Sequence, residues 1–325
     1  MQNKFPTIAI GCLVQWYEHN IFEEYVSSLS KAINNYDGKV IIDFVFNMNQ
    51  DLEKCSKSPG EISTKLLSLM HQYVLNYSLD VNYRVNIDDI YTVADYRYDF
   101  NQKYSELSDV LMWGETDMVV PSQTFISIAK LYHEKYDIDP NFIAFWGGAV
   151  MWDKSWDVLT FSKFQGKPFI EGDTKNYWSL RYKMSYDEME EWNKDYQYSY
   201  YKMNTPQFNG CGLVISSDVI KNGLNVPKDY AFFVSEDTGF MMLCRHHNLN
   251  QYLFKDLLLV HNRKHPDKRS DILGEELVKD KTDLGKLRAC HQWYKIANEY
   301  SNKNLQHLFD PNYKPLGWKD VFDAN

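Results

Sequence analysis

The sequence predicts an α/β fold with a mainly parallel sheet, and three observations support this class. Apolar runs that read as buried strands alternate with segments of helical period through the first half of the chain. With 325 residues, of which 44% are hydrophobic and 24% charged, the chain is long enough to bury a sizeable core as a globular protein. Two acids follow one of the apolar runs, at a strand end of the kind where open α/β sheets bind ligands.

The expected elements of the first half alternate in order. Residues 7–14 form the first strand, and residues 21–32 form the first helix because Phe22, Tyr25 and Leu29 recur with a helical period. Pro121 opens the last helix of this half, since proline is tolerated in the first turn of a helix. Between these elements we expect strands at 39–46, 81–85 and 109–113 and helices at 62–75 and 97–107, and the last helix runs to about 136.

The second half is less regular. Residues 150–206 are rich in tryptophan, tyrosine and charged residues, and they read as an insertion with one helix at about 186–196. We expect strands at 141–146, 210–216 and 252–260, a short helix that ends at Gly223, a helix from Ser235 to about 247, and a helix at 284–300. The chain therefore divides into one domain over residues 1–270 and a C-terminal helical extension over 271–325.

Composition limits the classes of function. The formal net charge of −9 argues against wholesale binding of nucleic acid or anionic lipid, although the C-terminal third is mildly basic. The five cysteines are odd in number, lie far apart and form no C-x-x-C pair, so neither a disulfide framework nor a zinc site is expected. The sequence has no run of about 20 apolar residues and no leader-like start, so we expect a cytoplasmic protein without a transmembrane segment.

The sharpest motif is Glu115-Thr116-Asp117, directly after the apolar run at 109–113. Acids at positions i and i+2 after a strand point to one side of the chain, where both can reach one hard divalent cation through oxygen ligands. An acidic turn after a strand explains the same residues equally well when the motif is taken alone.

A glycine pair and a histidine follow farther along the chain. Gly210 and Gly212 flank Cys211, which suits close approach of the backbone to a ligand and equally suits a bulge or a tight bend. His261 follows the apolar run 257–260 at a strand exit. A lone histidine is more often structural, but in this order it can supply a nitrogen ligand to the same cation.

Two adjacent acids, Glu236 and Asp237, open a helix behind Ser235. A serine cap and the helix dipole account for acids in a first helical turn. A general base aimed at an acceptor hydroxyl accounts for them as well.

Taken in order, these motifs resemble the GT-A glycosyltransferases, in particular the inverting, family 2-like enzymes that use nucleoside-diphosphate sugars. The resemblance covers roughly residues 5–265 and leaves out the tail. It implies a GT-A fold, Mn²⁺ or Mg²⁺ as the cation, and transfer of a sugar from a donor such as a UDP-sugar to a hydroxyl of a glycan or other acceptor. Residues 1–120 would then form the nucleotide-sugar-binding half and residues 121–270 the acceptor-binding half.

The resemblance also implies roles for individual residues. Asp117 and His261 would bind the metal with help from Glu115, while Asp237 would be the catalytic base and Glu236 would orient the acceptor. The donor would be contacted by Asp95, Arg97, Gly210, Gly212, Arg263 and Lys264.

Departures from the family pattern leave the nucleotide open. Glu115 stands where aspartate is usual, and Asn47, Asn49 and Asp51 replace the usual aspartate after the second strand. A phage-type DNA glycosyltransferase acting on a hydroxymethylated base is an alternative that the net charge disfavours. A nucleotidyltransferase would be expected to carry a glycine-rich phosphate loop where residues 15–18 read Gln-Trp-Tyr-Glu. A non-catalytic sugar-binding module would not need the acids and the histidine together.

Overall fold

The computed structural model describes residues 5–15, 18, 21–48, 59–77, 79–87, 91–148, 154–164, 183–227, 235–262 and 292–316. An eight-stranded sheet with the order β3-β2-β1-β4-β9-β6-β10-β8 lies at the centre of these residues. Strands β9 and β8 run antiparallel to their neighbours, and the other strands are parallel. The strands are β1 (Ile8–Gln15), β2 (Val40–Asn47), β3 (Val81–Asn86), β4 (Val110–Trp113), β6 (Phe142–Gly147), β8 (Tyr201–Met203), β9 (Val214–Ser216) and β10 (Asn250–Leu258).

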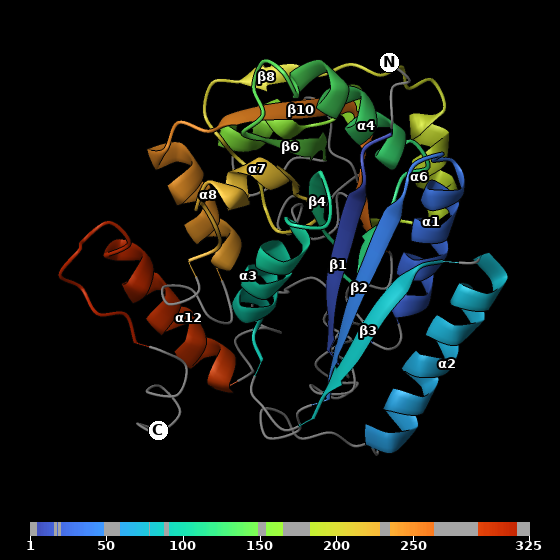
Figure 1. Ribbon diagram of the computed structural model, residues 1–325, viewed down its shortest axis with the longest axis horizontal. Coiled ribbons are helices and arrows are strands. Elements are labelled where there is room, and N and C mark those ends of the chain that lie inside the picture. The colour runs from blue at the N-terminus through green and yellow to red at the C-terminus, as the bar shows by residue number, and fades with distance from the viewer. Residues whose placement is uncertain are drawn as a thin grey trace.

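Helices cover both faces of this sheet. Figure 1 shows α1 and α2 on one side, α3, α7 and α8 on the other, and α12 outside α8. The helices are α1 (Phe22–Asn34), α2 (Pro59–Tyr77), α3 (Val93–Tyr104), α4 (Thr124–Lys135), α6 (Tyr186–Asn193), α7 (Ser217–Lys221), α8 (Glu236–His246) and α12 (Gln292–Gln306), with short 3-10 helices η2 (Lys154–Leu159) and η3 (Ser162–Phe164). The predicted α/β class, with a mixed and mainly parallel sheet and a C-terminal helix, is confirmed.

Burial on both faces explains why the central strands were visible in the sequence. All eight residues of β2 are buried, and so are the first seven of β1. Helix α3 packs closely on β1, because a Cβ at Gly11 would lie 2.4 Å from the Phe100 ring and from the Tyr96 hydroxyl. This close packing fixes α3 beside Gly11 of β1 and places Arg97 over Trp113, the last residue of β4.

A second, three-stranded sheet has the order β5-β11-β7. Its strands are β5 (Met118–Val119), β11 (Val260–Asn262) and β7 (Lys183–Met184). Strand β5 follows the acidic motif directly, and β11 carries His261 antiparallel to it. The small sheet therefore joins two segments that lie about 140 residues apart in the sequence, as residues 118 and 261 are register partners.

Several predicted boundaries were wrong. Helix α3 begins at Val93 rather than 97, because Thr92 and Asp95 form a capping box that starts the helix earlier. Only Val214–Ser216 of the predicted strand 210–216 is a strand. The predicted strand 252–260 is two elements, β10 and β11, which belong to different sheets.

Ser235 occupies the N-cap position of α8 as expected, but its side chain makes no capping hydrogen bond. Its backbone has φ 68° and ψ 17°, in the left-handed region, whereas a capping side chain normally projects from extended backbone. The predicted C-terminal helix is α12, which runs to Gln306, and residues 284–291 lie outside the described residues. Within the described ranges, no helix is both long and apolar enough to cross a membrane. The domain limits at 120 and 270 stay predictions.

Candidate functional site

The acidic motif lies in the short link between β4 and β5. The Gly114 amide donates to the Gly11 carbonyl at 2.7 Å, which extends the pairing of β4 with β1 up to the motif. The Asp117 side chain is 2% exposed, whereas that of Glu115 is 27% exposed. Asp117 is thus nearly enclosed, whereas part of the Glu115 side chain reaches solvent.

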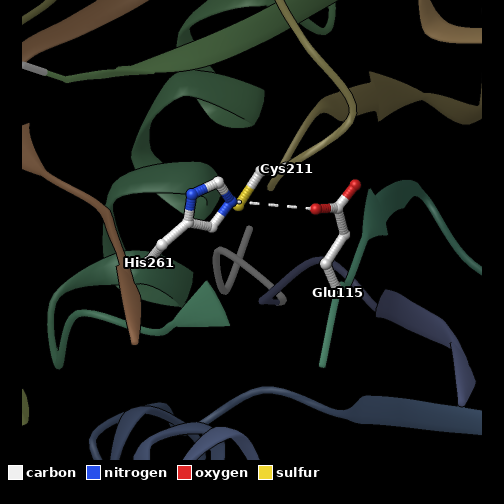
Figure 2. Close-up of side chains that lie close together, drawn as sticks. All are labelled: Glu115, Cys211 and His261. Atoms are coloured by element: carbon white, nitrogen blue, oxygen red, sulfur yellow. Dashed lines mark ion pairs between the residues drawn. The ribbon is translucent and has the colours of Figure 1, made fainter. Parts of the chain in front are cut away.

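His261 reaches the motif through the pairing of β11 with β5. His261 is the register partner of Met118, and the Asn262 amide donates to the Asp117 carbonyl at 2.6 Å. The Nε2 atom of His261 lies 3.8 Å from Oε2 of Glu115 and 3.9 Å from Oδ1 of Asp117. The three residues expected to bind metal therefore lie together, and Figure 2 shows the Glu115 carboxylate and the His261 ring pointing toward one another.

Cys211 joins this group from the loop before β9. The Gly212 amide donates to the Trp113 carbonyl, and the Trp113 amide donates to the Leu213 carbonyl, each at 2.9 Å. This pairing holds the loop beside the end of β4. The ligand atoms of Cys211, Glu115 and His261 all lie within 4.8 Å of one another, as Figure 2 illustrates. Cysteine spacing could not reveal this thiol, because its neighbours come from distant segments.

Arg97 connects the acidic motif to the start of α8. Its Nη2 donates to Oε1 of Glu115 at 2.7 Å and to the Gly210 carbonyl at 3.0 Å, and its Nη1 donates to Oε1 of Glu236. The guanidinium is 4.4 Å from the centre of the Trp113 ring. Burial alone would lower the pKa of Arg97, but Glu236, Glu115 and Asp237 hold it above its ordinary value.

Glu236 and Asp237 occupy the first turn of α8, but in different surroundings. Glu236 is buried at 7% exposure, and burial raises its pKa to about 7 against the opposing effect of Arg97. Asp237 is half-buried, and its Oδ2 accepts from the Gly210 amide at 2.9 Å while its Oδ1 accepts from the Thr238 amide at 2.7 Å. Both acids therefore have a structural role. Glu236 pairs with Arg97, and Asp237 satisfies an amide of the first helical turn.

Gly210 and Gly212 must each be glycine, but for different physical reasons. A Cβ at Gly210 would lie 2.4 Å from Nη1 of Arg97, so this glycine leaves room for the guanidinium. Gly212 has φ +80°, and a Cβ there would lie 2.9 Å from Leu259 and 3.0 Å from the Trp146 ring nitrogen. Both positions require glycine for packing and backbone conformation, in addition to any contact with a ligand.

The other predicted donor contacts are placed differently. Asp95 is buried in the capping box of α3, where its Oδ2 accepts from the amide and hydroxyl of Thr92. Arg263 and Lys264 lie outside the described residues. Asn47 is 2% exposed at the end of β2, where it donates to Gln15 at 3.0 Å and accepts from Asn86 at 2.8 Å, so it ties three strand ends together.

No protein-family model matches this chain, and no curated protein matches it in sequence. The chain is similar in structure to S. aureus TarS in complex with UDP-GlcNAc, with 10% identity and a TM-score of 0.45 over 78% of this chain and 57% of that one. The mannosyltransferase PcManGT from Pyrobaculum calidifontis in complex with GDP-Man and Mn²⁺ gives 11% identity and a TM-score of 0.46 over 94% of this chain and 74% of that one. GalNAc-T7 with UDP, GalNAc and Mn²⁺ gives 11% identity and 0.49 over 95% and 56%. This chain thus spans little more than half of two of these structures, and likenesses this distant say nothing about what it binds.

The donor set of the site suits a divalent cation. Carboxylate oxygens and an imidazole nitrogen converge from Glu115, Asp117 and His261. Glu236 and Asp237 add two more carboxylates nearby. Among the described residues, the positive charge that lies between these carboxylates is that of Arg97. The excess of carboxylates favours a bound ion with two positive charges.

Proposed function

We propose that this chain is a metal-dependent glycosyltransferase that moves a sugar from a nucleoside-diphosphate sugar to an acceptor hydroxyl. The observation that carries the proposal is the convergence of Glu115, Asp117 and His261 beside Glu236 and Asp237. The distances from Nε2 of His261 to the first two carboxylates, 3.8 and 3.9 Å, suit ligands around one ion. Arg97 links this cluster to the two acids of α8. A cation site and a candidate base side by side are what transfer from a diphosphate requires.

The proposed chemistry is inverting. Asp237 takes the proton of the acceptor hydroxyl as the acceptor oxygen bonds to the anomeric carbon and the bond from that carbon to the phosphate oxygen breaks. The electron pair of that bond leaves with the diphosphate. Asp117, His261 and Glu115 would hold Mn²⁺ or Mg²⁺, and such an ion would supply Lewis-acid neutralisation of the charge on the leaving diphosphate.

The two acids at the start of α8, Glu236 and Asp237, have different proposed roles. Oδ1 of the Asp237 carboxylate accepts from the amide and the hydroxyl of Thr238, whereas Oδ2 accepts only from the Gly210 amide among the described residues, which leaves a lone pair on Oδ2 for an acceptor proton. Those two amides also fix the orientation of the carboxylate, so the base is positioned before the acceptor arrives. Glu236 accepts a hydrogen bond from Arg97, which fixes its carboxylate, and in this position it is proposed to orient the acceptor. Arg263 and Lys264 are proposed to neutralise the diphosphate, a use that suits the planar fork of arginine.

A thermal-shift panel tests the proposal. Nucleoside diphosphates and their sugars are added to the wild-type chain and to Asp117→Asn, each with and without Mn²⁺. Binding stabilises the folded chain by about 2.7 kcal/mol when the ligand is at 100 times its Kd. We expect a rise in Tm that needs both nucleotide and Mn²⁺ and that disappears in Asp117→Asn.

Three outcomes would redirect the proposal. A nucleotide response that is the same with and without Mn²⁺ would contradict metal dependence. Hydrolysis of the nucleotide sugar with no transfer to any hydroxyl would make the chain a hydrolase. Strong retention on duplex DNA at physiological salt would favour a modified base in DNA as the acceptor.

A further inference from the structure

Cys211 lies in the site beside Glu115 and His261, and the proposed function gives it no role. Cys211 is 4% exposed, and its sulfur is a thiol that forms no disulfide. Its ligand atom lies within 4.8 Å of those of Glu115 and His261. The cluster therefore offers one sulfur, one nitrogen and one oxygen donor from three separate segments, the loop before β9, strand β11 and the link after β4.

These spacings suit a shared ion. Two ligands of one ion lie no farther apart than about twice a metal–ligand bond, or roughly 4 to 4.6 Å for sulfur, nitrogen and oxygen ligands. The His261 to Glu115 distance of 3.8 Å is already within this limit. A contraction of a few tenths of an ångström brings the sulfur within it as well.

Tyr25 is a second, independent sign that the cluster takes a ligand. The residue is fully buried in α1, and its hydroxyl has no hydrogen-bond partner among the described residues. A Cβ at Gly114 would lie 2.2 Å from this hydroxyl, so the phenol touches the backbone immediately before Glu115. Burial raises the pKa of Tyr25 well above its ordinary value, so the phenol keeps its proton.

We propose that Cys211 is a thiolate ligand of the cation site and shares the ion with His261 and Glu115. This inference rests on the cation site of the proposed function and gives that site a different preference. Thiolate and imidazole select ions such as Zn²⁺, Co²⁺ and Cd²⁺, whereas Mg²⁺ prefers oxygen donors alone. The site is therefore expected to bind zinc-like ions more tightly than Mg²⁺.

The coordination step conserves charge and atoms. The Cys211 thiol gives its proton to the buffer, the sulfur forms a bond to the cation, and one water leaves the coordination shell of the ion. No oxidant or reductant takes part. Oδ1 of Asp117 remains 3.9 Å from Nε2 of His261, so Asp117 would supply a further oxygen ligand.

Titration of the full-length chain with Co²⁺ tests the inference, because a cobalt–thiolate bond gives an intense charge-transfer band in the near ultraviolet. We expect this band in the wild-type chain. It should vanish in Cys211→Ser, which keeps the side-chain size, and persist in Cys244→Ala, a buried cysteine of α8 whose thiol lies in the core. Zn²⁺ affinity should fall at least about 10- to 100-fold in Cys211→Ser, with Mg²⁺ affinity unchanged.

The wild-type spectrum is decisive even if the variant folds poorly. Co²⁺ that binds without a thiolate band overturns the inference and leaves the proposed cation site intact. Persistence of the band in a folded Cys211→Ser chain also overturns it, because another cysteine would then hold the ion. Failure of Co²⁺, Zn²⁺ and Mn²⁺ to bind at all overturns both proposals, whereas a thiolate band without any nucleotide binding contradicts the proposed function alone.

Discussion

The guanidinium of Arg97 donates a hydrogen bond of 2.7 Å from Nη2 to Oε1 of Glu115, which ties helix α3 to the acidic motif. The same side chain is 4% exposed and also bonds Glu236. One buried cation therefore holds the link between β4 and β5 and the first turn of α8 at a fixed separation. The proposed active site depends on this contact for its geometry.

Removal of the Arg97 guanidinium should strongly lower the stability of the fold. Removing one partner of a buried ion pair leaves the other charge uncompensated, so we expect Arg97→Met to lower the free energy of unfolding by about 3–5 kcal/mol. Urea denaturation followed by circular dichroism measures the change. Arg245→Met is the matched control, because Arg245 is exposed and donates a hydrogen bond to the Pro206 carbonyl that is worth about 1 kcal/mol. Equal stability of the two variants would show that Arg97 does not organise the site.

Gly210→Ala should disturb the same contact from the other side. The new Cβ would lie 2.4 Å from Nη1 of Arg97, and that guanidinium is held by Glu115 and Glu236 and cannot easily move away. Overpacking of this kind costs about 1–3 kcal/mol. Gly148→Ala is the control, since a Cβ there meets nothing within 4 Å. A Gly210→Ala chain with the Tm of Gly148→Ala would mean that the guanidinium is free to shift.

Stability should depend on the ionisation of Glu236. Burial raises the pKa of Glu236 from 4.5 to about 7, so the folded chain holds this proton more tightly than the unfolded chain does. The resulting stabilisation is complete below pH 4.5 and is lost as the pH rises through about 7.

The side chain at position 236 cannot ionise in Glu236→Gln, so this variant should not lose stability as the pH rises through about 7. Between about pH 5 and about pH 8, the unfolding free energy of the wild-type chain should fall relative to that of Glu236→Gln. Urea denaturation at both pH values, with a metal chelator present, measures the difference between the two chains. If the difference is the same at both pH values, the carboxyl of Glu236 does not titrate in this range in the folded chain.

The sequence predicted the large parallel strands because each forms a mostly apolar run in the sequence, as in Val40–Asn47, where Asp43 and Asn47 are the polar residues. It could not predict β5 and β11, since strands of two and three residues exist only through their pairing with each other. The earlier start of α3 has a local signal in the sequence, Thr92 followed three residues later by Asp95.

The proximity of the candidate site residues was predictable to a similar degree. Glu115, Asp117 and His261 could be placed from residue type and position after strands. The contacts of Arg97 and the approach of Cys211 could not, because each depends on which strands become neighbours in the sheet. Residues far apart in sequence show no pattern that spacing alone can detect.

Asp237→Asn separates the proposed base from the fold and from binding. The amide oxygen of asparagine can still accept the Gly210 N–H bond, so the loop and α8 should keep their contact. It cannot take a proton from an acceptor hydroxyl, and loss of a positioned base costs about 10²–10⁴ in rate. We expect kcat for sugar transfer to fall by that factor while Mn²⁺ and donor affinities, measured by calorimetry, stay close to those of the wild type. Asp187→Asn, an exposed acid in the first turn of α6, controls for removal of a negative charge. Unchanged turnover in Asp237→Asn with metal still bound would rule out Asp237 as the base and remove the support for an inverting reaction.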